Sequence, residues 1–354
     1  MSAPFRVAVV GVDHPHGAHW RQLLAQFPRE LEVVAIVPGL SGTLASLEER
    51  YAHLPRLATV AELLVRVPFD GVLVCLNNED TPRAVIELAQ AGKHVLVEKP
   101  VAATAELLEP VVATVEAAGV AFQNGYLWRY DDAANRLRRM VAEGQFGKLS
   151  SLELTYVTSD AQRRGPQHYL FDPTISGGGF FHWLGCHYLD LLRYITGEAI
   201  IGVTARVGVY GAVPLAVEDG GTVILELESG ALVTFTGGYW LPRWAGENRW
   251  TIRGTERWVH WDPARPGTSG VLEIHGPQPQ WHAMEDTFTV PADTTPGYGG
   301  RRGIELVTDW LRAARGRGAC RNTMASTQAT LQLLDLVYQA SREERRLACH
   351  IPPL

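Results

Sequence analysis

The first residue that could do chemistry is Lys99, which follows the apolar segment Val95–Val97 and precedes Pro100. The β-branched residues of that segment, bounded by Gly92 and Pro100, predict a buried parallel strand. Open α/β sheets bind ligands just beyond the carboxyl ends of such strands. An apolar cleft there would desolvate the amine and make it a competent proton donor or acceptor near neutral pH. On spacing alone, a solvated lysine at a strand end remains the simpler interpretation.

Two histidines, His14 and His16, follow the first apolar segment of the chain, Phe5–Gly11. A dinucleotide-binding loop would have the pattern G-x-G-x-x-G at this place. Here Asp13 replaces the second glycine and His16 the third, and Gly17 comes one position late. The N-terminus of the helix that follows still offers an anion site, and either histidine could donate to a phosphate.

The second expected strand, Leu31–Val37, does not end in the acidic residue that would hold a ribose 2'-hydroxyl. Pro38 follows it, and then Ser41 and Thr43, whose hydroxyls suit either nicotinamide dinucleotide. The sequence therefore leaves the choice between NAD and NADP open.

The His14-x-His16 pair also resembles the metal-binding pair of hydrolases built on (β/α)8 barrels, with Asp13 and His19 as further ligands. Such a hydrolase needs eight β/α units. Adjacent strands after residue 200 argue against that fold, so we predict no metal site and keep the hydrolase as a lesser alternative.

Strands and helices must position these residues, and over the first 120 or so residues the two alternate. This alternation predicts a doubly wound parallel sheet. From about residue 200 to 290 strands follow one another with almost no helix, for example Asn248 to His260, which predicts a largely antiparallel sheet. Two helices, about Arg301 to Ala314 and Ser326 to Glu343, close the chain.

Composition excludes several classes of partner. A formal net charge of -6 and a pI near 6.1 give no basic face for nucleic acid. No apolar run approaches the roughly 20 residues that cross a bilayer, and the start of the chain has no charged leader with a cleavage site. The four cysteines are far apart, as reduced thiols would be. We expect a cytoplasmic protein that binds small molecules, with no nucleic acid or membrane partner.

Several motifs in order resemble the glucose-fructose oxidoreductase, inositol dehydrogenase and rhizopine catabolism family, written Gfo/Idh/MocA. They are LNNEDTPRAVIELAQAGKHVLVEKP at Leu76 to Pro100, GYLWRYDD at Gly125 to Asp132, GGGFFHWLGCHYLD at Gly177 to Asp190, VEDGG at Val217 to Gly221 and IRGTE at Ile252 to Glu256. The resemblance covers nearly the whole chain.

This resemblance implies an α/β fold with two domains. Residues 1–124 would form a dinucleotide-binding Rossmann domain. Residues 125–354 would form a domain with a large, mostly antiparallel open sheet that binds substrate and mediates oligomerisation, its final helices packing back toward the Rossmann domain. It also implies an NAD- or NADP-dependent oxidoreductase acting on a hydroxyl-bearing carbon of a sugar, inositol or related polyol, assembled as a homodimer or homotetramer.

The family's catalytic lysine falls on Lys99 and its histidine on His187, whereas Trp183 stands where the family has an aspartate. We expect Lys99 to transfer the proton with His187 as its partner. A capping or core cluster around His187 and Asp190 is the alternative.

We expect further site residues at family positions and in the loops beside them, with packing or loop hydrogen bonds as the alternative role of the tryptophan and histidine side chains. Those expected to bind substrate are Trp128, Arg129, His168, His182 and Trp183. Those expected to bind the cofactor are Gly11, Val12, Asp13, His14, His16, Pro38, Ser41, Leu76, Asn77, Asn78, Glu98 and Lys99. Because Asp13 and Trp183 depart from the family pattern, a cofactor-bound sensor that has lost catalysis remains the main alternative.

Overall fold

The computed structural model describes residues 3–39, 47, 49–242, 245–265, 267–278 and 281–354. By its contacts the chain divides into two compact units. The first comprises residues 1–130 and 294–328, and the second comprises residues 131–293 and 329–354.

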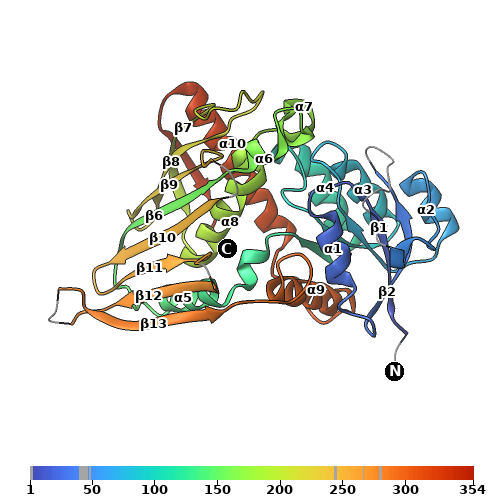
Figure 1. The fold of residues 1–354 in the computed structure, drawn as a ribbon, viewed down its shortest axis with the longest axis horizontal. Helices are drawn as coiled ribbons and strands as arrows, with labels where there is room; N and C mark the ends of the chain where they lie inside the picture. The colour runs from blue at the N-terminus through green and yellow to red at the C-terminus, as the bar shows by residue number, and fades with distance from the viewer. Residues whose placement is uncertain (1–2, 40–46, 48, 243–244, 266, 279–280) are drawn as a thin grey trace. The chain divides into compact units, whose positions relative to one another are not determined.

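The first unit is built on a five-stranded parallel sheet (Figure 1). Its strands are β1 (Phe5–Val10), β2 (Leu31–Val37), β3 (Gly71–Val74), β4 (His94–Val97) and β5 (Phe122–Asn124). Strands β3 and β4 are apolar along their length and almost wholly buried, as helices on both faces of a parallel sheet require. The predicted doubly wound sheet is confirmed.

The strand order β2-β1-β3-β4-β5 reverses direction at β1. In doubly wound sheets ligands bind at this switch point, outside the carboxyl ends of the strands. The loops that follow β1, β3 and β4 therefore form the expected binding edge of this unit.

Helices complete the first unit. They are α1 (Gly17–Leu24), α2 (Val60–Arg66), α3 (Thr81–Gln90), α4 (Ala105–Ala118) and α9 (Arg301–Ala314), with short 3-10 turns at Glu49–Tyr51 and Leu127–Tyr130. Helix α9 has the predicted bounds. Its buried Trp310 meets the Phe5 ring edge-on, with centroids 5.5 Å apart, so a late helix packs against the first strand.

The second unit is built on a nine-stranded sheet of order β13-β12-β11-β10-β6-β9-β8-β7-β14. The strands are β6 (Leu149–Thr158), β7 (Ile200–Gly208), β8 (Gly220–Leu227), β9 (Leu232–Gly238), β10 (Gly246–Gly254), β11 (Trp258–Asp262), β12 (Thr268–His275), β13 (Met284–Pro291) and β14 (Leu347–Ile351). Among the pairings given for these strands only β6 with β9 is parallel. The predicted mostly antiparallel sheet is confirmed.

One sequence prediction in this sheet is wrong. The single strand expected from Asn248 to His260 is two strands, β10 and β11, joined by a tight hairpin in which the Gly254 amide donates to the Arg257 carbonyl at 2.8 Å. The alternation of apolar and polar residues is similar on both sides of the turn, so the pattern alone did not reveal it.

The helices of this region are α5 (Asp132–Ala142), α6 (Asp160–Arg164), α7 (Pro173–Ser176), α8 (Cys186–Thr196) and α10 (Met324–Glu343), with a 3-10 turn at Tyr169–Phe171 and a π-helical turn at Phe181–Gly185. The sheet buries one face and exposes the other. On β8, Val223 and Leu225 are fully buried, whereas the alternate residues Thr222 and Ile224 are exposed. This alternation is that of an open antiparallel sheet.

Candidate functional site

The loop after β1 is drawn tightly across the sheet. Gly11 has φ +92°, and a Cβ there would lie 2.2 Å from the Cys75 carbonyl oxygen, so a side chain cannot be accommodated. The Val12 amide donates to the Pro38 carbonyl at 2.8 Å. The loop therefore lies beside the ends of both β2 and β3.

A buried carboxylate, Glu98, organises this loop. Its Oε1 accepts hydrogen bonds from His16 Nδ1 and from Trp20 Nε1, both at 2.7 Å, and its Oε2 accepts from the Lys99 amide at 3.0 Å. Burial opposes ionisation, but His16, and after it His14 and Lys99, outweigh that effect and hold the pKa of Glu98 well below its ordinary value. Glu98 is therefore an anion surrounded by cationic and donor groups.

Tyr298 supports the same cluster. Its ring lies 4.6 Å from the ring of His16 and 4.6 Å from that of Trp20, centroid to centroid. Sequence reasoning missed both Trp20 and Tyr298, which are separated from Glu98 by many residues and belong to no motif.

His14, His16 and Glu98 could also hold a metal ion, since one ligand atom from each lies within 4.8 Å of the others. In the structure, however, His14 Nδ1 accepts the His16 amide at 3.1 Å and Glu98 is bonded to His16, Trp20 and Lys99. The five-stranded sheet also excludes the eight-unit barrel on which the hydrolase alternative depended. That alternative is therefore wrong for this fold.

Lys99 is buried, with 2% of its surface exposed, directly after β4. The Lys99–Pro100 peptide bond is cis, and Val101 has φ +84°, an unusual value for a β-branched residue. A Cβ at Gly125 would lie 3.2 Å from Glu98 Oε2 and 3.5 Å from Lys99 Cγ. The glycine of the GYLWRYDD motif therefore leaves room mainly for the Glu98 carboxylate, since 3.5 Å from Lys99 Cγ is an ordinary contact distance.

Asn77 occupies the edge after β3 and offers a donor. Its Oδ1 accepts the amides of Glu79 at 3.1 Å and Asp80 at 2.7 Å, which orders the start of α3. Its Nδ2 is buried with no hydrogen-bond partner among the described residues. A buried amide that lacks an acceptor fits a site that a dinucleotide would complete. Leu76 and Asn78 flank it, and Ser41 and Thr43 lie outside the described residues.

Trp128 and Arg129 lie in the 3-10 turn Leu127–Tyr130 of the first unit. The guanidinium of Arg302 lies 4.1 Å from the centre of the Trp128 ring. Arg129 is buried, and its Nη1 donates to the Arg321 carbonyl at 3.2 Å. Both positions are thus held by contacts with the segment that follows residue 294.

In the second unit, His182 belongs to a hydrogen-bonded chain. Its Nδ1 lies 2.9 Å from the Tyr338 hydroxyl, and that hydroxyl lies 2.9 Å from Glu218 Oε1. Glu218 also accepts the Gly179 amide at 2.6 Å and the Phe181 amide at 2.9 Å. Burial raises the pKa of Glu218 to about 7, against the lowering effect of these donors.

The triple glycine makes this chain possible. Gly177 has φ +76° and ends α7. A Cβ at Gly178 would lie 2.3 Å from His182 Nδ1 and 2.4 Å from the Tyr338 hydroxyl, and one at Gly179 would lie 1.8 Å from the Glu218 carbonyl oxygen. Sequence reasoning identified the glycines and the VEDGG motif, but missed Glu218 and Tyr338 as partners of His182.

The remaining predicted residues of this unit are His168, Trp183 and His187. His187 is buried on α8, and the ring of Trp183 in the preceding π-helical turn lies 5.6 Å from the Arg164 guanidinium. His168 Nδ1 accepts the Leu170 amide at 3.3 Å, and burial, followed by Arg164 and Arg163, lowers the pKa of His168 to about 4. His168 is therefore neutral at physiological pH.

Asp190 is buried, and its Oδ1 accepts the Thr330 hydroxyl at 3.1 Å. Thr330 in turn accepts Arg193 Nη1 at 2.9 Å. Asp190 therefore joins α8 to α10, which is a structural role.

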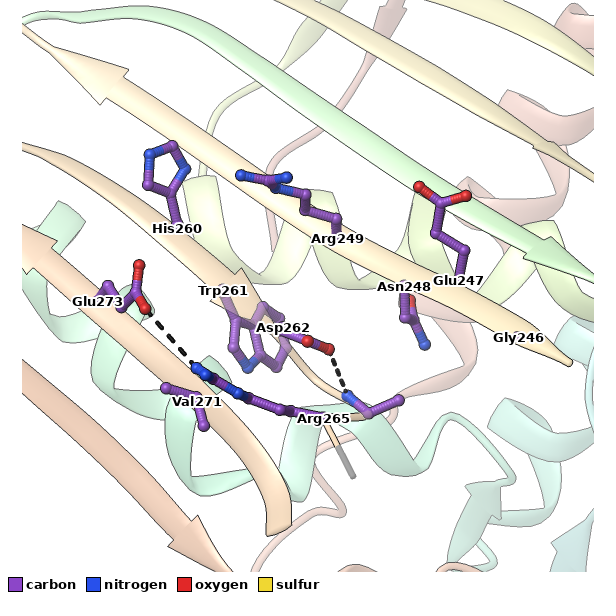
Figure 2. Close-up of a pocket in the computed structure, with 11 residues that line it drawn as sticks. Gly246, Glu247, Asn248, Arg249, His260, Trp261, Asp262, Arg265, Val271 and Glu273 are labelled. Atoms are coloured by element: carbon purple, nitrogen blue, oxygen red, sulfur yellow. Dashed lines mark hydrogen bonds and ion pairs between the residues drawn. The ribbon is translucent and has the colours of Figure 1, made fainter. Parts of the chain in front are cut away.

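A separate hollow of about 430 Å³ lies on β10, β11 and β12 (Figure 2). Its lining includes Glu247, Arg249, His260, Asp262, Arg265 and Glu273. Figure 2 shows Arg265 extending toward Glu273, and the two form an ion pair at 3.7 Å. None of the residues predicted to bind cofactor or substrate lines this hollow.

Two family models match the chain. Residues 5–126 match the oxidoreductase family model described as an NAD-binding Rossmann fold, and residues 134–260 match the C-terminal domain model of the GFO/IDH/MocA family. Together they cover more than half of the sequence.

Curated relatives include sugar and inositol dehydrogenases. Myo-inositol 2-dehydrogenase of Thermotoga maritima is 31% identical over 48% of this chain and 50% of that protein. D-glucoside 3-dehydrogenase of Escherichia coli is 28% identical over 58% of each chain. The matches thus span only about half the length of these relatives.

Solved structures share the whole fold. Levoglucosan dehydrogenase in complex with NADH and L-sorbose superposes with a TM-score of 0.85 at 19% identity, covering 100% of both chains. At this identity the likeness establishes the fold alone.

Proposed function

This chain belongs to the Gfo/Idh/MocA family of NAD-binding oxidoreductases, and we propose that it is an NAD(P)-dependent dehydrogenase acting on a hydroxyl-bearing carbon of a sugar, inositol or related polyol. The observation that carries the proposal is the buried Lys99 at the switch-point edge of a parallel sheet, anchored beside Glu98. The substrate class follows from the relatives, which are named for inositol and glucosides.

The cofactor would be held by the loops after β1, β3 and β4. Gly11, Val12, Asp13 and His14 belong to the loop after β1, the Pro38 carbonyl accepts the Val12 amide, and Asn77 Nδ2 supplies a buried donor between Leu76 and Asn78. Glu98 orients His16 and so shapes the loop. Because Pro38 provides no carboxylate at the end of β2, the proposal covers NAD and NADP equally.

Lys99 would move the proton of the reaction. Hydride leaves a carbinol carbon only as its hydroxyl proton is removed, so a base must lie within hydrogen-bond reach of that oxygen. The bound nicotinamide supplies the hydride acceptor. In this proposal Lys99 receives the proton, His187 assists it, and Trp128, Arg129, His168, His182 and Trp183 bind the polyol.

A thermal-shift experiment tests cofactor binding. NAD, NADP, NADH and NADPH are each added to the full chain, and a ligand present at 100 times its dissociation constant should add about 2.7 kcal/mol to the free energy of unfolding. No shift with any of the four would argue against both the enzyme and a cofactor-bound sensor. A shift with zinc alone would point to the His14, His16 and Glu98 cluster instead.

Hydride transfer with a panel of sugars, sugar acids and inositols then separates enzyme from sensor. The sensor alternative is favoured by Asp13 in the cofactor loop and by Trp183 at the family's aspartate position. Turnover with any member of the panel excludes it. Product analysis accompanies the assay, because a tightly bound cofactor that is reduced and reoxidised within one turnover leaves no change in absorbance.

We also propose that the open sheet face joins two copies of the chain, as a homodimer or half of a homotetramer. The hollow in Figure 2 carries both signs of charge, with Arg249 and Arg265 near Glu247 and Glu273, so a two-fold contact could pair opposite charges. Light scattering should give a dimer or tetramer, Arg249→Glu should weaken it, and Arg139→Glu on α5 should not. A wild-type monomer at high concentration contradicts this proposal.

We place the protein in the cytoplasm, which its four free cysteines support. No helix among the described residues is long and apolar enough to span a membrane. We propose two domains, 1–124 and 125–354, although by contacts residues 125–130 and 294–328 belong to the first unit, and limited proteolysis that cleaves near residue 124 would support this boundary.

A further inference from the structure

One arginine of the second unit carries a charge that no other described residue compensates. Arg164 is the last residue of α6 and is partly exposed, so a solute can reach it. Its Nε is buried without a hydrogen-bond partner, and its guanidinium forms no hydrogen bond or ion pair with any other described residue. A charged group withdrawn from water in this way costs free energy unless an acceptor is supplied. Arg164 is therefore suited to binding an anion that comes from outside the chain.

The carboxylate with the largest effect on Arg164 already serves another arginine. Asp160 Oδ1 accepts two hydrogen bonds from the Arg163 guanidinium, one of them from Nε at 2.7 Å. Burial lowers the pKa of Arg164, and Asp160 opposes that effect without reversing it. Asp160 and Arg163 therefore balance each other, and the positive charge of Arg164 is left over.

Trp183 orients the Arg164 guanidinium without neutralising it. The guanidinium carbon lies 5.6 Å from the centre of the Trp183 ring, which is within the range of a cation–π contact. Trp183 is buried in the π-helical turn Phe181–Gly185, so its ring is a fixed surface. An indole has a donor N–H and no acceptor atom, so it takes none of the guanidinium hydrogens. The contact therefore leaves the N–H groups of Arg164 for an acceptor in the ligand.

The charge of Arg164 also acts on His168. Burial is the main cause that lowers the pKa of His168 to about 4, and Arg164 and Arg163 are the next two. His168 is thus neutral and adds no cation of its own. Arg164 contacts Trp183 and acts electrostatically on His168, which are two of the residues assigned to the substrate in the proposed function. An anion bound by Arg164 would therefore lie beside them.

We propose that Arg164 determines substrate specificity by binding the carboxylate of a sugar acid, so that the enzyme prefers uronic or aldonic acids to neutral sugars and inositols. This inference rests on the proposed function and names the substrate class within it. A guanidinium binds a carboxylate through two parallel hydrogen bonds, and one uncompensated positive charge matches one carboxylate. A phosphate ester carries a larger negative charge and matches a single arginine less well.

Matched substrates give the first test, which needs no variant. Hydride transfer by the full chain is measured with glucose and glucuronate, with galactose and galacturonate, and with glucitol and gluconate. We expect kcat/KM to be at least about tenfold higher for the acid in one or more pairs, as a charged hydrogen bond would give. Equal or higher values for the neutral member of every pair overturn the proposal. A stronger preference for glucose 6-phosphate overturns it as well.

The second test removes the charge. Arg164→Met should raise KM for the preferred acid about 10- to 100-fold and change kcat/KM for its neutral partner by less than about twofold. Arg164→Lys keeps the charge but not the planar fork, so its KM should lie between those of the wild type and Arg164→Met. A merely structural role would lower kcat/KM for both members of the pair equally, and that result contradicts the proposal. Thermal denaturation checks that each variant is folded.

Arg206→Met is the matched control, because Arg206 belongs to the same unit and forms an exposed ion pair with Glu344. It should leave the preference for the acid unchanged.

Isothermal titration with glucuronate and with glucose, in the presence of the cofactor, separates this inference from the proposed function. Glucuronate binding that Arg164→Met weakens, without turnover of any substrate, would contradict the proposed function and support the role of Arg164. Turnover of neutral sugars alone would do the reverse. Neither binding nor turnover of any sugar acid overturns the inference.

Discussion

The two units each bury a glutamate beside a histidine, yet the two carboxyl groups behave oppositely. Glu98 faces the imidazoles of His16 and His14 and the side chain of Lys99, and its pKa lies well below the ordinary value. Glu218 faces two backbone amides and a phenol, and its pKa is raised to about 7. Both are buried in their own units.

The difference shows that neutral donors compensate burial less than positive charges do. Amide and phenol donors offer partial charges, whereas His16 and Lys99 can offer whole ones at short range. Glu98 is therefore suited to anchoring a loop as a permanent anion. Glu218 is held by uncharged donors, which are two backbone amides and the Tyr338 hydroxyl.

The largest effect is expected from Glu98→Gln, which leaves His16, Trp20 and the Lys99 amide without the anion to which they are hydrogen-bonded. Breaking a buried pair from one side costs about 3 to 5 kcal/mol of unfolding free energy, measured by urea denaturation at pH 7. The control is Glu153→Gln, which breaks only the exposed pair with Arg253 and should cost less than about 1 kcal/mol. Equal losses in the two variants would show that burial does not matter here.

Glu218→Gln should change how stability depends on pH. The folded pKa of about 7 lies above the ordinary 4.5, so the folded state holds the proton more tightly and the Glu218 contribution falls as pH rises from 4.5 to 7. The shift corresponds to about 3 kcal/mol over that range. The variant should lose this slope, and denaturation at pH 5 and pH 8 measures it.

Glu98 should make the free energy of unfolding change with pH in the opposite direction. Its folded pKa is lowered, so its contribution is present above pH 4.5 and is lost as pH falls below that value. In Glu98→Gln, the free energy of unfolding should therefore depend less on pH below 4.5. Its dependence on pH between 4.5 and 7, which is due to Glu218, should remain. If a single variant removed both slopes, the two carboxyl groups would not be independent.

Lys99→Met should keep cofactor binding and lose turnover by at least 100-fold, about 2.7 kcal/mol of transition-state stabilisation. Thermal shift and hydride transfer measure the two quantities. Lys93→Met is the control, since Lys93 Nζ donates to the Phe69 carbonyl at 2.8 Å and lies 4.6 Å from the centre of the Phe69 ring, and Lys93 is not among the proposed site residues. Near-normal turnover in Lys99→Met would move the proton-transfer role to His182 or His187.

The smallest effect is expected from His187→Ala, because His187 assists Lys99 in the proposed reaction. Its turnover should fall, but less than that of Lys99→Met, in the same assay. A greater loss than in Lys99→Met would reverse the two roles. Cofactor binding should be unchanged, since His187 is not among the residues proposed to hold the cofactor.

Local patterns were enough to predict the fold class and the strand ends. Strand β2 and helix α9 have the expected bounds, and Lys99 follows β4 as predicted. Periodicity and chain-breaking residues act over a few positions, so these features can be read locally. The hairpin between β10 and β11 was missed because the alternation of apolar and polar residues is similar before and after its turn.

The chemical environment of the site was decided by the tertiary structure. Sequence alone identified Glu98, His16 and His182 as candidates. The partner of Glu98, Trp20, is 78 residues away in the chain, and the partner of His182, Tyr338, is 156 residues away. Hydrogen-bond direction and burial depend on such distant partners, and they set the opposite pKa shifts of Glu98 and Glu218. The sequence determined which residues are present at the strand ends and glycine turns, and only folding decided what charge and which proton each of them carries.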